Sequence, residues 1–143
     1  MPSIGTCINK TDETLLVYGP NSGTAPFPRD NMLYRLPAGQ RTPANWDGDG
    51  IYVPNDREAS QAVLPDKAGP VAVKFGVGSV DVSFTVTRDE DEYDIPVNQG
   101  IFTPAEVCTP SDWPTCVNWN IPNHAHTELG TYPEVPGHLP ARN

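Results

Sequence analysis

The chain has 143 residues, with nine Lys and Arg against 18 Asp and Glu, which gives a formal net charge of −9. Hydrophobic residues make up 37% of it, enough for one modest core and a single domain. Nucleic acid and anionic membranes repel so acidic a chain, so we expect neither as a partner. No apolar run approaches the roughly 20 residues that a transmembrane helix needs.

The first residues carry no recognisable targeting signal. Met1-Pro2-Ser3 leads directly into a strand-like segment, without the basic n-region and apolar h-region of a signal peptide. We therefore expect either a protein that is intracellular at first or one from which a leader peptide was removed. Of the possible locations we favour the extracellular space or the surface of a virion.

The three cysteines leave the redox compartment open. Cys108 and Cys116 flank a short loop that can bring them together, so an oxidising compartment predicts a disulfide and a reducing one predicts two free thiols. Cys7 lies in an apolar segment, where we expect a small buried hydrophobe.

Short strands punctuated by turn residues fill the first part of the chain. Alternating or apolar runs predict strands at residues 4–9, 14–18, 32–36 and 51–53, with weaker ones at 93–97 and 117–121. Residues 10–13 form a polar turn between the first two. A helix of about two turns is predicted only at residues 57–64, which end at Pro65.

The most regular pattern predicts a β-hairpin. Apolar residues alternate with polar or small ones in residues 71–77 and 80–86, and Gly78-Ser79 suits a type II′ turn between them. In the resulting register Val73 pairs with Phe84. All the alternating apolar side chains then share one face of a sheet: Val71, Val73, Phe75, Val77, Val80, Val82, Phe84 and Val86.

These elements predict an all-β fold, an antiparallel β-sandwich or small barrel with a Pro-rich extended C-terminal arm. Residues 1–97 form the predicted core. Eight of the 17 prolines lie from Pro96 onward, so we expect residues 98–143 to be irregular, unable to build sheet ladders and packed on the core or on a neighbour. The predicted anchors of this arm, on its own sandwich or on a partner subunit, are Tyr132, Val135 and Leu139.

A short Asp/Gly-rich segment before residue 56 resembles the calcium loops of EF-hands and thrombospondin-type repeats. In those loops, oxygens at positions one, three, five and twelve and a backbone carbonyl at position seven surround the ion. The resemblance implies a calcium site made by Asn45, Asp47, Asp49, Ile51 and Asp56. The other interpretation is a pair of tight Asp-Gly turns that lead into a strand.

Two other polar groupings are candidate cation sites. The acidic run at residues 89–94 follows the predicted hairpin, where a solvated loop is favoured over cation binding. His124, His126 and Glu128 would share one face if that stretch were a strand, which suits a metal, although ordinary loop histidines are the commoner case.

Each tryptophan adjoins an amide or carboxylate side chain. An aromatic face beside short polar groups suits a sugar ring, so Trp46, Trp113 and Trp119 are candidate glycan-binding residues. The alternative is that they cover the ends of the sandwich. Asn9-Lys10-Thr11 also fits the N-glycosylation sequon.

The sequence carries no GxSxG, HExxH or GxxxxGK[ST] motif. We therefore expect a non-catalytic β-sandwich that works by binding or assembly, such as a subunit of a virion or another multi-subunit assembly, with a protein partner or a second copy of itself. The alternative is a secreted recognition protein of lectin or toxin-component type, since residues 8–11 and 15–17 are similar to secreted β-sandwich toxins. A small carbohydrate-active hydrolase that uses Asp47 and Asp49 is a third hypothesis.

Overall fold

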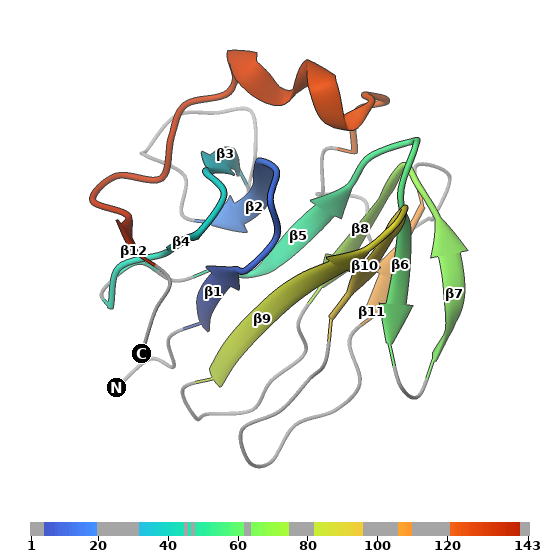
Figure 1. Cartoon of the computed structure of the whole chain (residues 1–143), viewed down its shortest axis with the longest axis horizontal. Helices are drawn as coiled ribbons and strands as arrows, with labels where there is room; N and C mark the ends of the chain where they lie inside the picture. The colour runs from blue at the N-terminus through green and yellow to red at the C-terminus, as the bar shows by residue number, and fades with distance from the viewer. Residues whose placement is uncertain are drawn as a thin grey trace.

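The computed structural model describes residues 5–19, 32–44, 46, 48–61, 64–74, 82–95, 106–109 and 121–140. In this part the protein is all-β, and its strands form two sheets (Figure 1). The strands are β1 (Gly5–Asn9), β2 (Leu15–Gly19), β3 (Met32–Leu36), β4 (Gln40–Arg41), β5 (Gly50–Val53), β6 (Glu58–Gln61), β7 (Leu64–Ala68), β8 (Val71–Lys74), β9 (Val82–Asp89), β10 (Glu92–Asp94), β11 (Glu106–Cys108) and β12 (Leu139–Pro140), and the 3-10 helix is η1 (His126–Thr131).

The seven-stranded sheet has the order β12-β4-β1-β9-β10-β6-β7, and the five-stranded sheet has the order β11-β8-β5-β2-β3. Two pairings are parallel, β1 with β9 and β10 with β6, so the prediction of a purely antiparallel fold is wrong in this detail. Both parallel pairs join strands that are far apart along the chain. The chain between them is therefore long enough for the crossover connection that parallel strands need.

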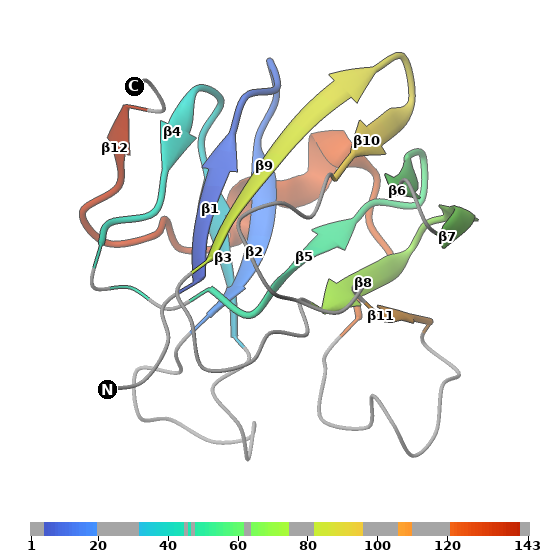
Figure 2. The same cartoon turned by 90° about the horizontal axis from the view of Figure 1, so that it is seen from below.

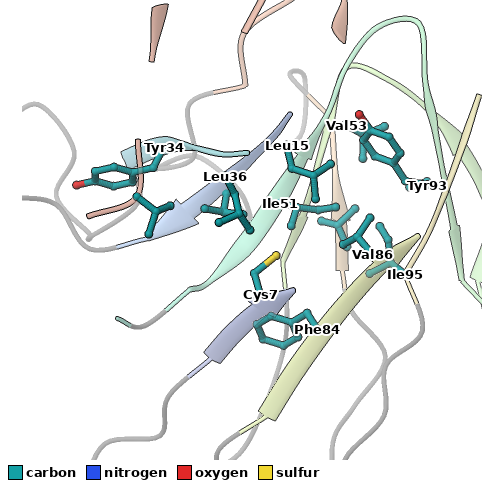
Figure 3. Packing of buried hydrophobic residues seen from close by; sticks show 14 of the residues in the cluster. Cys7, Leu15, Tyr34, Leu36, Ile51, Val53, Phe84, Val86, Tyr93 and Ile95 are labelled. Atoms are coloured by element: carbon teal, nitrogen blue, oxygen red, sulfur yellow. The ribbon is translucent and has the colours of Figure 1, made fainter. Parts of the chain in front are cut away.

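Side chains from both sheets meet in one hydrophobic core. Figure 3 shows Cys7 and Phe84 of the seven-stranded sheet beside Leu15 and Ile51 of the five-stranded one. The same cluster includes Val17, Leu36, Val53, Val71, Val73, Val86 and Tyr93, each buried. The two sheets therefore face each other across this core.

The predicted hairpin does not form. β8 pairs with β5 and β11 in the five-stranded sheet, whereas β9 pairs with β1 and β10 in the other. Val73 lies beside Ile51, and Phe84 lies beside Cys7. Their side chains still share one core, because they approach it from opposite sheets instead of standing side by side in one. Residues 75–81, which include the predicted turn, lie outside the described residues.

The predicted helix at residues 57–64 is also wrong, because this stretch contains strand β6 and the start of β7. β6 has a partner on each side, β10 and β7. Two neighbouring strands outweigh the weak helical preference of so short a segment, which alone could not sustain a helix.

A second cluster of buried side chains lies on the outer face of the five-stranded sheet. Leu16, Tyr52 and Ala72 are cross-strand neighbours there, and Leu129 of η1 covers them. β2 is therefore buried along its whole length, since one of its faces packs on the core and the other under η1.

We call residues 121–140 the C-terminal segment. It includes η1 and then runs around the molecule to β12, beside β4 (Figures 1 and 2). Arg35 of β3 donates its backbone N–H to the Pro133 carbonyl, and its carbonyl accepts from the Val135 N–H. The segment thus contacts the edge of one sheet and extends the other.

The prediction that residues 98–143 build no sheet ladder is thus wrong for β11 and β12. β11 occupies a short stretch without proline, and Pro140 lies on an edge strand, where a missing N–H is tolerated. Of the predicted strand at residues 117–121, residues 117–120 lie outside the described residues, and Ile121 is not in a strand.

Candidate functional site

Ionisable side chains from five elements of the fold gather at one end of the sheets. We call this group the charged cluster; its members are Asp12, Glu13, Asp56, Arg57, Arg88, Tyr93 and His126. They come from the β1–β2 turn, the β5–β6 turn, β9, β10 and η1. The fold itself brings these residues together, since apart from the consecutive strands β9 and β10 these elements are far apart in sequence.

Glu13 is the most enclosed carboxylate of the cluster, with its side chain 12% exposed. It accepts hydrogen bonds from Arg57 Nε at 3.1 Å and Nη2 at 2.8 Å, and from the Tyr93 hydroxyl at 2.5 Å. Burial alone would raise the pKa of Glu13, but the hydrogen bonds from Arg57 and Tyr93 outweigh it, so this pKa lies below its ordinary value.

The other acidic members of the cluster have a basic partner each. Arg88 makes a two-pronged contact with Asp12, at 3.0 and 3.1 Å, and its Nε lies 3.4 Å from Glu13 Oε2. Asp56 accepts the His126 backbone N–H at 2.9 Å and lies 2.6 Å from its ring Nδ1. The hydrogen bond from Arg88 lowers the pKa of the Asp12 carboxyl.

This geometry favours a structural role for the cluster. Each carboxylate accepts from a donor on a distant segment, so the cluster ties the β1–β2 turn, both sheets and η1 together. The Tyr93 hydroxyl donates a hydrogen bond to Glu13, and burial together with this hydrogen bond raises the pKa of Tyr93. A phenol held in this way is a poor acid–base catalyst near neutral pH.

Comparison of this chain with protein-family models, with curated proteins and with solved structures found no match. The functional interpretation therefore rests on the residues themselves.

Strand β5 lies between two residues of the predicted calcium loop, Asp49 and Asp56. Asp49 precedes β5 and Asp56 follows it, and the four extended residues of β5 span about 13 Å. The side chain of Ile51 lies in the core, and Asp56 contacts His126. Asn45 and Asp47 lie outside the described residues, so the calcium site as a whole stays a prediction.

The predicted histidine site is not assembled in the part of the chain that the structure describes. Residues 126–131 form η1 instead of a strand, because the Glu128 carboxylate caps the backbone N–H of Ala125. His124 Nε2 lies 3.2 Å from the Tyr132 hydroxyl, whereas His126 contacts Asp56. Within the described ranges, no group of three His, Cys, Asp or Glu side chains is placed to hold a metal ion.

Trp46 is a core residue, not an exposed platform for a sugar ring. Its ring packs edge-on against Tyr34 at a centroid distance of 5.3 Å and fills the space beside Gly19. A Cβ atom at Gly19 would lie 2.0 Å from the Trp46 ring, so the glycine is needed for this packing. Trp113 and Trp119 lie outside the described residues, and their roles stay predictions.

The cysteines differ in state. Cys108 is disulfide-bonded, and Cys116, its predicted partner, lies outside the described residues. Cys7 is free and buried, and burial raises its pKa to about 12. Its thiol therefore stays protonated and unreactive at physiological pH.

Asn9 has a role that the sequence motif alone misassigned. Its side chain is fully buried, and its Nδ2 donates to the carbonyls of Glu13, Leu36 and Pro37. Its Oδ1 accepts from both the N–H and the hydroxyl of Thr11. The Asn and Thr side chains of the sequon are thus buried in a turn that joins β1, β2 and β3, and in the folded protein the Asn9 amide is inaccessible to glycosylation. The side-chain bonding of Asn and Thr to nearby backbone is the signal that could have indicated this.

The predicted anchors of the C-terminal arm divide into two kinds. Val135 is buried in the main core, and Tyr132 packs against the second cluster, so both hold the arm on its own chain. Leu139 is 39% exposed. No helix of the described part is long and apolar enough to cross a membrane.

Proposed function

We propose that this protein is a non-catalytic binding or assembly module, a β-sandwich that serves as a rigid scaffold for a protein partner. The observation that carries the proposal is the charged cluster. Glu13, Arg57 and Tyr93 bond to one another across distant segments, so groups that could do acid–base chemistry instead fix the fold. A scaffold rigid before it binds loses little conformational entropy on binding, which favours affinity.

In this proposal the C-terminal segment belongs to the scaffold, whereas the sequence also allowed it to lie on a partner subunit. Its backbone pairs with β3 and β4 of its own chain, and Leu129 and Val135 are buried there. These contacts support a segment that stiffens the scaffold, and they leave partner binding to other surfaces.

The disulfide at Cys108 favours one form of the alternative function, a secreted recognition protein. Structural disulfides persist in oxidising compartments and are rare in the cytosol. In this form Trp113 and Trp119 are the remaining candidates for glycan contact. Loss of binding to a glycan array in the Trp113→Ala/Trp119→Ala variant, with the fold intact, would support it.

The test of the main proposal is reconstitution of a complex. The folded chain is first used to capture proteins from the cells that produce it. Each captured protein is then purified and titrated against the chain by calorimetry. Self-association of the chain is measured by light scattering. Saturable binding of one purified component, or a defined oligomer, supports the proposal. A chain that stays monomeric and binds none of the purified candidates contradicts it.

A further inference from the structure

The last described part of the C-terminal segment, residues 136–140, is held on the sheet with little apolar burial. Its strand β12 lies at the edge of the seven-stranded sheet, against β4 (Figures 1 and 2). Val135 is buried in the main core, but both residues of β12 are exposed. Pro140 also has no N–H to donate to a neighbouring strand. Polar contacts therefore decide whether this stretch stays docked.

A Pro-Gly turn places the His138 ring where it contacts both the segment and β4. Pro136 precedes Gly137, whose φ of 71° suits the third position of a type II turn. The chain folds back there, and His138 Nε2 lies 3.1 Å from Glu134 Oε1. On the other side of the ring, Nδ1 lies 3.1 Å from Oε1 of Gln40 in β4. The histidine side chain is 26% exposed, so these contacts leave much of it enclosed.

Both oxygens that face the His138 ring are hydrogen-bond acceptors. An imidazolium carries an N–H on each ring nitrogen and fills both hydrogen bonds, whereas a neutral imidazole carries one N–H and fills one of them. The Glu134 carboxylate also attracts the positive form of the ring. This geometry therefore holds the protonated ring more tightly than the neutral ring.

Two arginines lie near this histidine in the described part of the chain. Arg41 follows Gln40 in β4, and its Nε donates to the Pro140 carbonyl at 3.2 Å. Arg35 of β3 lies 3.6 Å from the second carboxylate oxygen of Glu134. Both oppose a further positive charge, and the carboxylate offsets part of that repulsion. Guanidinium and carboxylate groups ordinarily stay charged between about pH 5.5 and about pH 8, so histidine is the member of this set that titrates there.

We propose that His138 is a pH-sensitive clip that holds β12 on β4. The protonated ring ties Gln40 to Glu134, and loss of the proton removes one of these hydrogen bonds together with the attraction to the carboxylate. Docking of β12 is therefore strongest below about pH 6.5, where a histidine ordinarily titrates, and weakens as the pH rises above it. Release uncovers the backbone edge of β4, while Val135 holds the rest of the segment. This switch does not depend on the proposed binding function.

Nuclear magnetic resonance of the isotope-labelled full chain tests the clip between about pH 5.5 and about pH 8. The amide chemical shift of Leu139 reports the docked fraction of β12, and the ring nitrogen shifts of His138 report its protonation. We expect the equilibrium constant for docking of β12 to fall roughly fivefold across this range, in step with the loss of the His138 proton. The amides of β2 should keep their shifts, since the core is not affected.

Two variants complete the test. His138→Gln is neutral at every pH, so we expect it to dock β12 equally weakly across the range. His124→Gln is the matched control, because it removes a histidine of the same segment whose Nε2 contacts the Tyr132 hydroxyl, and it should follow the parent protein. If β12 stays docked while His138 loses its proton, the inference is overturned, and Gln40 presents its amide N–H to a neutral ring. A pH-dependent release that persists in His138→Gln also overturns it, since another group is then the switch.

Discussion

At the scale of single residues, two polar side chains, one fully buried and one largely enclosed, hold the ends of the strands together. Asn9 satisfies three carbonyls and Glu13 binds an arginine and a tyrosine. Both belong to the short region around the β1–β2 turn. Buried groups of this kind stabilise a fold only while all their partners are present, so their removal is a sensitive test.

Replacement of Asn9 tests the buried turn. Asn9→Ala leaves the carbonyls of Leu36 and Pro37 without their donor, and we expect a loss of about 3 kcal/mol in the free energy of unfolding, measured by urea titration. Asn55→Ala is the matched control, because Asn55 makes an exposed contact with Asn123, and we expect a loss of less than about 0.5 kcal/mol. Equal losses would show that Asn9 has no special role.

Glu13 makes stability depend on pH in a definite direction. Its folded pKa lies below the ordinary 4.5, so the unfolded chain binds more protons in the interval between the two values. The stabilisation is therefore complete above about pH 4.5 and is lost as the pH falls through the folded pKa.

The Glu13→Gln variant isolates this contribution. We expect it to lose about 2 kcal/mol at neutral pH and to show a shallower fall in urea midpoint between about pH 6 and about pH 3. Glu90→Gln, on the exposed β9–β10 turn, should follow the parent protein. A parallel fall for Glu13→Gln and the parent would contradict the assignment.

At the scale of elements, the alternation of residues predicted which side chains face the main core but not which strands pair. Val71 and Val73 face the core, as do Phe84 and Val86, in agreement with the pattern. An alternating pattern is satisfied equally by a neighbour in the same sheet and by a facing sheet, so the hairpin could not be distinguished from the observed arrangement.

An unbroken apolar run carried information that alternation did not. Leu15-Leu16-Val17-Tyr18 has no polar face, and in the structure both faces of β2 are covered. Such a run indicates an additional covering layer. The charged cluster, by contrast, has no local signal, because Glu13, Arg57 and Tyr93 meet only after the sheets assemble.

The covering layer gives a prediction at this scale. Leu129→Ala empties a site under η1, and we expect a loss of about 3 kcal/mol in unfolding free energy. Leu139→Ala removes the same atoms from an exposed position, where less than about 1 kcal/mol is expected. Similar losses in thermal or urea unfolding would mean that η1 does not pack as described.

At the scale of the whole molecule, the C-terminal segment and the charged cluster link elements that are far apart in the sequence. The segment contacts β3, β4 and the outer face of the five-stranded sheet, all on its own chain. Among the described residues, no contact of this segment lies on the outer face of the seven-stranded sheet. In this division the C-terminal segment stiffens its own chain and covers the outer face of one sheet only.

Hydrogen exchange across a dilution series tests this division most directly. The amides of Arg35, Asn55 and Val135 bond to partners that join the C-terminal segment to the rest of the chain. We predict that they are protected like those of β2 and that their exchange rates do not change on dilution. Protection that disappears on dilution while β2 stays protected would place the segment on a neighbouring molecule and contradict the account.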